Sequence, residues 1–180
     1  PILLCELFGL DYDDPKWDDF LDQLTVDQLK YIVLQGSYKS GMDIPELGIT
    51  RVHNEDSTTQ VNIPGAGSNN VFLPYDITTA ATWNEDIAYR RGKILANVSL
   101  WGGGSAESRV PGWYAPAVNV HRSPFGGRVG EYLSEDGFLA GKISAQIVKG
   151  AQEKGMFCYV KHFAVNSQET NRCGLITWAD

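Results

Sequence analysis

Charged and amide side chains follow three short apolar runs of this sequence, at the points where strands would end. The runs lie at 49–53, at AVNV before His121 and at FCYV before Lys161. In parallel α/β folds the carboxyl ends of the strands form one rim, and ligands bind there. Three such strand ends predict a single polar pocket. The polar residues at or after the ends of the three runs are His53, Asn54, Glu55 and Asp56; His121, Arg122, Arg128 and Glu131; and Lys161, His162, Asn166, Gln168 and Glu169.

These side chains suit a ligand that is rich in hydroxyl groups. A carboxylate such as Asp56 accepts hydrogen bonds from two adjacent hydroxyls, whereas Arg128 and Lys161 donate to ring hydroxyls. His162 adds a further polar group beside Lys161. Aromatic side chains cover the apolar faces of such a ligand. The aromatic residues expected near this pocket are Trp83, Trp113, Tyr114 and Phe163.

Helical patterns fill residues 12–35 and restart at Thr25. Asp14 is placed to cap a helix that has a proline at its first position. Thr25 and Gln28 have the spacing of a capping box, and Gly36 is a typical helix end. These local signals predict two consecutive helices at the start of the chain.

Two longer helices are expected downstream, over 84–100 and 137–154. Asn84 is placed to cap the first, and Gly155 ends the second. Apolar residues recur on one face of each helix. The expected apolar faces are Ile87, Ile94, Leu95 and Val98 in the first helix, and Leu139, Ile143, Ile147 and Ala151 in the second. The expected strands are 49–53, 112–120 and a strand from 156 whose last residues are polar.

Short, wholly apolar strands that alternate with helices indicate an α/β domain with a parallel sheet. The pattern contains about four β/α units, and a closed eight-stranded barrel needs roughly 200 residues or more. The 180 residues therefore suit an open doubly wound sheet or the first half of a (β/α)8 TIM-type barrel. We expect one domain, with leading helices in 1–36 and the β/α units in 37–180.

The charge balance argues against nucleic-acid or membrane partners. Lys and Arg number 15 against 22 Asp and Glu, which gives a formal net charge of −7. Such a balance disfavours binding to phosphate backbones or anionic lipid. No secretory signal is recognised, so we expect a cytoplasmic protein. Its three cysteines, Cys5, Cys158 and Cys173, are expected as free thiols, and no metal-binding spacing is present.

Two stretches together resemble one enzyme family. APAVNVHRSPFGGRVGEYLSEDGFLAG, followed by YVKHFAVNSQETNR, closely resembles the catalytic barrel domain of glycoside hydrolase family 3, which includes β-glucosidases and β-xylosidases. The shared pattern is Asn–x–x–Arg, Gly–Arg, Glu and Ser–Glu–Asp, then Lys–His–Phe with Asn and Gln–Glu downstream. The resemblance extends over about residues 40–180. It implies the first half of a (β/α)8 barrel, a carbohydrate substrate, and no metal or organic cofactor.

The resemblance also implies roles for individual residues. Asp56 falls where the family has an aspartate that contacts the hydroxyls of the sugar in the −1 subsite. Arg128 matches the Gly–Arg arginine, and the Lys–His pair matches Lys161 and His162, which contact the same sugar. Two further residues are expected next to these: Glu131, which supports Arg128, and Arg122, which lies behind the site or on its rim.

The chain departs from the family pattern in two respects. Asp56 precedes Ser–Thr, where the family has Gly–Pro. The nucleophilic aspartate of these retaining enzymes lies in a Ser/Thr–Asp–Trp motif on a later strand, and the acid/base lies elsewhere. We therefore expect no catalytic residue in this chain, and partners in the remaining half of the barrel and in other domains. The isolated segment is expected to be inactive and to form homo-oligomers or aggregates through its open sheet edge.

Four further interpretations concern individual residues, residue pairs or the whole chain. A lysine at a strand end, such as Lys161, can form a Schiff base in a lyase or aldolase. A non-catalytic sugar-binding or structural fragment is also compatible with the sequence. Glu135 and Asp136 are expected to stabilise a helix N-terminus, and Glu169 and Arg172 to form a local ion pair.

Overall fold

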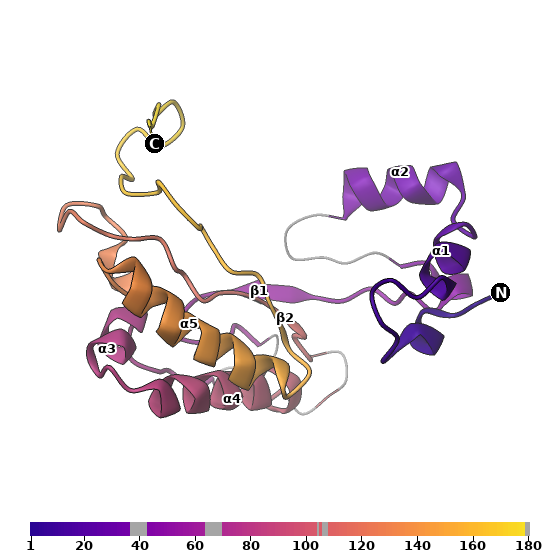
Figure 1. Cartoon of the computed structure of the whole chain (residues 1–180), viewed down its shortest axis with the longest axis horizontal. Coiled ribbons are helices and arrows are strands. Elements are labelled where there is room, and N and C mark those ends of the chain that lie inside the picture. Colours follow the sequence, from indigo (N-terminus) through magenta and orange to yellow (C-terminus); the bar gives the residue numbers. More distant parts are fainter. Residues whose placement is uncertain (37–42, 64–69, 104, 106–107, 179–180) are drawn as a thin grey trace. The chain divides into compact units, whose positions relative to one another are not determined.

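The computed structural model contains two compact units, Pro1–Asn54 and Glu55–Asp180. Figure 1 shows the course of the chain. None of the helices that the described residues form is both long and apolar enough to cross a bilayer. The structure describes residues 1–36, 43–63, 70–103, 105 and 108–178.

The first unit consists of short helices around a small apolar core. It contains the 3₁₀ turns η1 (Leu4–Leu7) and η2 (Pro45–Leu47) and the helices α1 (Lys16–Leu21) and α2 (Val26–Gln35). Its short elements bury one side each, which is enough for a core of a few side chains. The buried core residues are Leu7, Phe20, Ile44 and Leu47.

Local capping explains where these helices begin and end. The Thr25 hydroxyl accepts a hydrogen bond from the Gln28 N–H at 3.2 Å, and the Thr25 N–H donates to Gln28 Oε1 at 2.8 Å. The predicted capping box is thus confirmed, as is the helix end at Gly36. Asp14 Oδ1 accepts the N–H of Lys16 at 2.9 Å. α1 therefore begins at Lys16, one residue later than predicted.

The second unit carries a three-stranded sheet in the order β1-β2-β3. Its strands are β1 (Asn54–Asp56), β2 (Gly112–Tyr114) and β3 (Phe157–Cys158). β2 and β3 are parallel, with Trp113 opposite Cys158. The predicted α/β class with a parallel sheet is confirmed.

The strand predicted at 49–53 is misplaced. β1 begins after that segment, and Ile49 instead forms an isolated antiparallel bridge with Ile44. The Ile49 side chain packs against the core of the first unit. Ile49 is therefore apolar because it covers this small core, and not because it belongs to a strand of the sheet.

The strand predicted at 112–120 is shorter than expected. β2 ends at Tyr114, and the peptide bond before Pro116 is cis. Proline has no N–H to donate to a sheet ladder, so regular pairing stops there. Pairing resumes at Ala117, which forms a parallel bridge with Lys161. The bridge therefore keeps the segments that follow β2 and β3 side by side up to Lys161, a residue of the candidate site.

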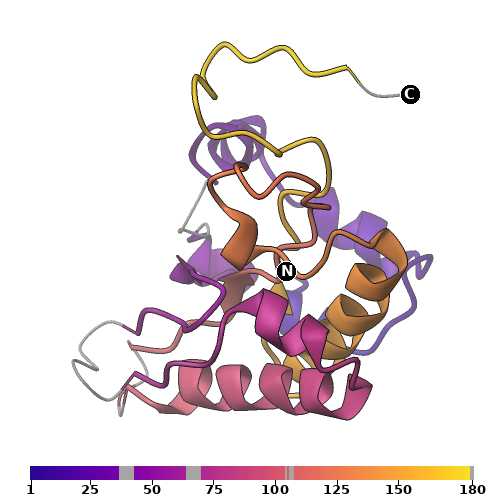
Figure 2. The same cartoon turned by 90° about the vertical axis from the view of Figure 1, so that its left-hand side faces the viewer.

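In the described part of the second unit, the helices α3 (Asp76–Ala81), α4 (Glu85–Trp101) and α5 (Gly137–Gln152) pack against one another (Figures 1 and 2). Asn84 caps α4 as predicted, because its side chain accepts the N–H groups of the first turn. Asp136 does the same for α5, which confirms the structural role expected of this carboxylate.

α4 and α5 approach each other closely because glycines lie at their crossing. A Cβ atom on Gly92 would stand 2.0 Å from the carbonyl oxygen of Ile147. A Cβ atom on Gly150 would stand 2.1 Å from the carbonyl oxygen of Tyr89. The two backbones are therefore in contact from both sides, and neither position has room for a side chain.

This close crossing changes which face of α4 is buried. Leu95 is buried as predicted, but Ile87 and Ile94 are 45% and 43% exposed. Small residues face α5 because only they permit the short distance between the helices. On α5 the prediction holds for Ile143, Ile147 and Ala151, which are buried in the main core. The buried residues of α4 are Ala88, Arg91, Gly92, Leu95, Ala96 and Ser99.

Candidate functional site

Lys161 follows β3, and its ammonium group lies between two carboxylates. Nζ is 2.6 Å from Asp56 Oδ1 and 2.9 Å from Glu131 Oε1. Partial burial acts to lower the pKa of Lys161, but hydrogen bonds to the two carboxylates outweigh it and raise the pKa. Lys161 is therefore a fixed positive charge at neutral pH.

Arg128 continues this series of charges. It precedes the 3₁₀ turn η4 (Val129–Glu131), which brings the Glu131 carboxylate back onto the guanidinium. Nε and Nη2 of Arg128 donate to Glu131 Oε2 and Oε1 at 2.5 and 2.8 Å. Nη1 is 3.4 Å from Glu169 Oε1, and the predicted pair of Glu169 with Arg172 is confirmed at 3.5 Å. The resulting ion-pair chain runs through Asp56, Lys161, Glu131, Arg128, Glu169 and Arg172.

Glu131 is the centre of this ion-pair chain. Partial burial acts to raise the pKa of Glu131, but hydrogen bonds from Arg128 and Lys161 outweigh it, so the pKa lies below its ordinary value. The hydrogen bond to Glu131 likewise raises the pKa of Arg128 against partial burial. The charges thus hold one another in the ionised state and fix the side chains that carry them.

Asp56 is held by the turn that follows β1. Its Oδ1 accepts the N–H of Ser57 at 2.7 Å, in addition to the contact with Lys161. The Ser57 carbonyl accepts a hydrogen bond from Nε1 of the buried Trp113 at 2.6 Å. The core of the unit therefore determines where this carboxylate lies.

A buried ion pair fixes the next residues of the same turn. Nη2 of Arg91 donates to the Thr58 carbonyl and to Asp76 Oδ1, both at 2.6 Å. Nη1 donates to the Pro74 carbonyl at 2.7 Å. Burial raises the pKa of Asp76 to about 7, although the Arg91 guanidinium opposes the shift. The pair ties the turn after β1 to the segment before α3.

His162 lies next to Lys161, and its ring contacts Tyr132. Nδ1 of His162 is 3.1 Å from the Tyr132 hydroxyl. Partial burial lowers the pKa of His162, and the positive charges of Arg128 and Lys161 lower it further. The ring is therefore neutral at neutral pH.

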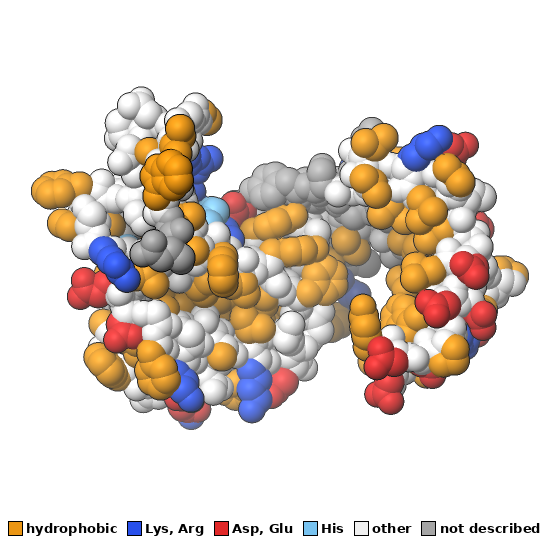
Figure 3. Space-filling view, turned by 45° about the horizontal axis from the view of Figure 1, so that its top comes forward, with side chains coloured by type: hydrophobic (Ala, Val, Ile, Leu, Met, Phe, Trp, Pro, Cys, Tyr) orange, Lys and Arg blue, Asp and Glu red, His pale blue; other side chains and the backbone are white. Residues whose placement is uncertain are grey.

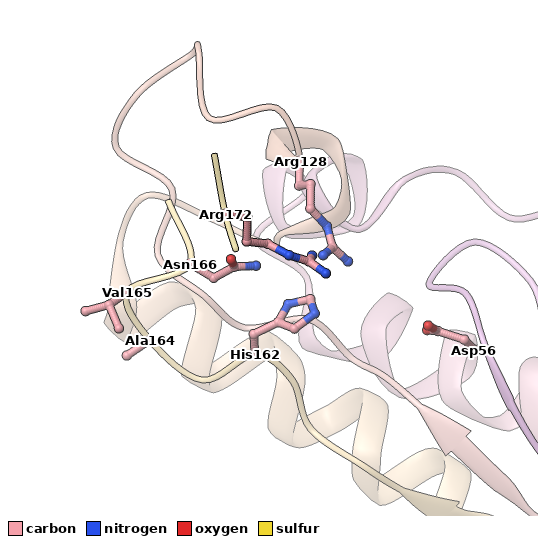
Figure 4. A pocket seen from close by; sticks show the side chains of 7 residues that line it. All are labelled: Asp56, Arg128, His162, Ala164, Val165, Asn166 and Arg172. Carbon is pink, nitrogen blue, oxygen red and sulfur yellow. The ribbon is translucent and has the colours of Figure 1, made fainter. Parts of the chain in front are cut away.

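These side chains surround a polar cavity of about 480 Å³. In Figure 4 the guanidinium groups of Arg128 and Arg172 and the imidazole of His162 point toward one another, and the Asp56 carboxylate faces them from the other side. An adjoining hollow of about 370 Å³ shares Asp56 and Arg128 and includes Lys161 in its wall. The residues that line the larger cavity are Asp56, Arg128, His162, Ala164, Val165, Asn166 and Arg172.

The arrangement suits a neutral polar ligand better than a metal ion. Hydrogen-bond donors on Arg128, Arg172 and His162 face an acceptor on Asp56 across the cavity. Among the residues that the structure describes, no group of three or more His, Cys, Asp or Glu side chains could hold a metal ion. The site can therefore donate to and accept from several hydroxyls of one ligand.

Comparisons with known proteins point to one enzyme family. The model of the glycosyl hydrolase family 3 N-terminal domain matches residues 18–175. The chain belongs to glycosyl hydrolase family 3. β-Glucosidase A of Butyrivibrio fibrisolvens is 40% identical over 166 residues, which cover 87% of this chain and 19% of that protein. β-Glucosidase B of Emericella nidulans is 35% identical over 164 residues, which cover 89% of this chain and 18% of that protein.

Solved structures of this family have the same fold over most of the chain. β-Glucosidase 3B of Thermotoga neapolitana, in complex with glucose, matches with a TM-score of 0.74 and 31% identity, covering 87% of this chain and 24% of that one. The family 3 β-glucosidase of Bifidobacterium adolescentis matches with a TM-score of 0.75 and 28% identity, covering 84% of this chain and 21% of that one. The chain spans about a fifth of the length of the curated relatives.

The structure brings together the four residues that the family resemblance indicates. Asp56, Arg128 and His162 line the larger cavity, and Lys161 bonds to Asp56 beside it. Ser57, where the family has glycine, has a positive φ of 103°, a conformation that glycine adopts most easily. The backbone of this turn therefore has a conformation that suits the glycine of the family pattern.

Arg122 lies apart from this cavity. Its side chain is exposed and borders a small separate hollow with Tyr132 and Asn166. Glu131, by contrast, bonds directly to Arg128. Of the two residues expected next to the site, Glu131 is part of the ion-pair chain, and Arg122 borders the smaller hollow.

The aromatic residues expected around the ligand are differently placed. Trp113 is fully buried in the core, so the expectation that it covers a ligand is wrong. Tyr114 stacks on Tyr159, with ring centroids 4.5 Å apart. Trp83 and Phe163 are exposed. The sequence does not show which of these aromatic side chains are buried and which are exposed.

Sequence reasoning missed several residues of the site. Arg172 lines the cavity, and Tyr132 contacts His162 from the protein side. The Arg91–Asp76 pair was also missed, because an arginine in an amphipathic helix is ordinarily assigned to the solvent face. Among these further residues, only Asn119 has a signal in the sequence, because it begins the Asn–x–x–Arg pattern. In the structure its side chain accepts the N–H of Asn166.

Proposed function

We propose that this chain forms the sugar-binding wall of the −1 subsite of a retaining β-glycosidase that hydrolyses terminal β-linked sugars. The observation that carries the proposal is the convergence of Asp56, Arg128 and His162 on one cavity, with Lys161 bonded to Asp56. The names of the relatives, β-glucosidases, and the glucose bound in a related structure support it.

The chemistry of a sugar matches the fixed charges of this cavity. A sugar hydroxyl both donates and accepts, so it can donate to the Asp56 carboxylate and accept from a cation. Lys161 and Arg128 are cations near Asp56, and both are paired with Glu131. Such charge-assisted hydrogen bonds are about twice as strong as neutral ones.

We assign the bond-breaking groups of this enzyme to other parts of a longer protein. A retaining glycosidase needs a nucleophilic carboxylate and an acid/base about 5–5.5 Å apart. In the described site, Asp56, Glu131 and Glu169 are each paired with Lys or Arg. That pairing suits binding and orientation, and it leaves the nucleophile and the acid/base to the regions that the longer relatives have in addition.

We assign the sheet of the second unit to the first half of a (β/α)8 barrel. Parallel pairing of β2 with β3, across the helix α5, is the arrangement of a barrel unit. Apolar side chains remain exposed on β3 and just after it, including Phe157 at 44% and Val160 at 48%. Figure 3 shows that hydrophobic side chains also occupy broad areas of the surface in that view. Further strands and helices of a complete barrel would cover such side chains.

Schiff-base chemistry at Lys161 is disfavoured. A Schiff-base lysine needs a depressed pKa so that its amine is unprotonated. The pKa of Lys161 is raised, because Asp56 and Glu131 both bond to its ammonium group. A binding role for Lys161 agrees with this charge.

Calorimetric titration of the chain with glucose tests the proposal. We expect binding by the unmodified chain and a loss of affinity of about 10-fold or more in Lys161→Ala, since hydrogen bonds to charged groups contribute about 1.5–3 kcal/mol. Lys154→Ala is the matched control, because Lys154 is exposed beyond the end of α5. Circular dichroism shows whether both variants fold. Equal affinities of folded Lys161→Ala and Lys154→Ala, or no binding by the unmodified chain, would contradict the proposal.

A further inference from the structure

One nitrogen of the His162 imidazole contacts the hydroxyl of the buried Tyr132, and the rest of the ring faces the cavity. Nδ1 is 3.1 Å from the Tyr132 hydroxyl, and the two rings are perpendicular, with centroids 5.9 Å apart. Tyr132 is 2% exposed, whereas His162 lines the cavity. In Figure 4 the His162 ring lies between Asn166 and Asp56. The tyrosine therefore contacts the histidine on the side away from the ligand space.

Three elements fix the position of the Tyr132 hydroxyl. Asn166 Nδ2 donates to the Tyr132 oxygen at 2.5 Å. The N–H of Asn166 donates to Oδ1 of Asn119 at 2.9 Å, and Asn119 is buried. Asn119 follows β2, Tyr132 follows η4 and Asn166 follows β3. The hydroxyl is thus set by the packed core of the unit and not by the ligand.

The proton of Tyr132 has one good acceptor. The Tyr132 oxygen already accepts from Asn166, so its own proton goes to His162 Nδ1 at 3.1 Å or to the Asn166 carbonyl at 3.5 Å. The second distance is beyond that of a good hydrogen bond. A neutral imidazole that accepts at Nδ1 carries its proton on Nε2.

We propose that Tyr132 is a positioning residue that holds His162 in the neutral tautomer protonated at Nε2, so that the ring donates a hydrogen bond to a ligand hydroxyl in the cavity. The ligand part of this inference rests on the proposed sugar-binding function. The tautomer part rests only on the contacts of Tyr132, His162 and Asn166. A hydroxyl held by Nε2–H has its own proton free to donate, and Asp56 is the acceptor across the cavity.

The protonation of His162 is read directly by NMR of the ¹⁵N-labelled chain, which has 3 histidines. Two-bond ¹H–¹⁵N correlations distinguish the two tautomers, and loss of one set of signals in His162→Gln assigns the residue. We expect the Nε2-protonated form in the unmodified chain at neutral pH. An Nδ1-protonated His162 would overturn the inference without any tyrosine variant.

Tyr132→Phe removes the hydroxyl and retains the buried ring. We expect it to raise the pKa of His162, because the hydrogen bond from Tyr132 favours the neutral ring, and to let the Nδ1-protonated tautomer appear. Tyr89→Phe is the matched control, since the Tyr89 hydroxyl bonds to Glu153. An unchanged tautomer and an unchanged His162 pKa in Tyr132→Phe would overturn the inference. The other ionisable groups that face His162 are Arg128, Arg172, Lys161, Glu131 and Asp56, and all five are retained in both variants.

Glucose titration of the same variants separates this inference from the proposed function. We expect Tyr132→Phe to weaken glucose binding by about 2- to 10-fold, the effect of one neutral hydrogen bond, and Tyr89→Phe to leave it unchanged. Equal affinities for the two variants would overturn the ligand part. No glucose binding by the unmodified chain would overturn the proposed function, while the NMR measurements would still decide the tautomer.

Discussion

The crossing of α4 and α5 predicts a large difference between two glycine substitutions on the same helix. Gly150→Ala places a methyl group 2.1 Å from the carbonyl oxygen of Tyr89, whereas ordinary contact begins at 3.4 Å. The helices must therefore separate locally by about 1.3 Å, because the obstacle is backbone and cannot rotate away. Gly141→Ala, also in α5, meets no atom within 4 Å.

The expected free energies follow from this geometry. Overpacking at Gly150 costs about 3 kcal/mol, the upper end of the usual range. Better helix propensity returns about 1 kcal/mol, so the net loss of stability is about 2 kcal/mol. Gly141→Ala gains up to about 1 kcal/mol from propensity alone. The two variants should therefore differ by about 3 kcal/mol in the free energy of unfolding.

Urea denaturation followed by far-ultraviolet circular dichroism measures this difference. The unmodified chain, Gly150→Ala and Gly141→Ala are compared at one pH and one protein concentration. Equal midpoints for the two variants would refute the reasoning, because they would mean that α4 and α5 do not touch through their backbones at Gly150.

Two charge substitutions give further predictions. Glu131→Gln removes the partner of Arg128 and Lys161, and should lower the free energy of unfolding by about 1–3 kcal/mol at neutral pH. The pKa of Glu131 is lowered on folding, so its contribution is complete above the ordinary value of 4.5 and disappears as the pH falls through the folded-state pKa. Urea midpoints of the two chains should then converge in acid, and a constant difference would contradict this account. Arg91→Met leaves Asp76 buried without its partner and should cost about 3–5 kcal/mol. Thermal unfolding measures that loss, and a melting temperature equal to that of the unmodified chain would exclude a structural role for the pair.

Features set by neighbouring residues were predictable from the sequence. Thr25, Asn84 and Asp136 cap helices as expected, because a cap depends on a side chain and the next few N–H groups. The predicted strand positions were less accurate, since the apolar Ile49 packs against the small core of the first unit and not into the sheet. The exposure of Ile87 was not foreseeable, because it depends on how closely α4 approaches α5.

The site was predictable as a set of residues but not as a network. A pattern shared with a family indicated Asp56, Arg128, Lys161 and His162, which lie up to 106 positions apart. Their partners depend on tertiary contacts that no local pattern encodes. Tyr132 is one of these, since its neighbour Leu133 is equally buried and only the fold distinguishes their roles.

The indole of Trp113 gives the chain an internal optical reporter. It is fully buried, whereas the other four tryptophans, all in the described part of the chain, have some contact with solvent. Acrylamide should therefore quench the emission of those four and spare a blue-shifted component from Trp113. Trp113 Nε1 donates to the carbonyl of Ser57, the residue after Asp56. The emission of Trp113 should therefore change when the turn that carries the Asp56 carboxylate moves.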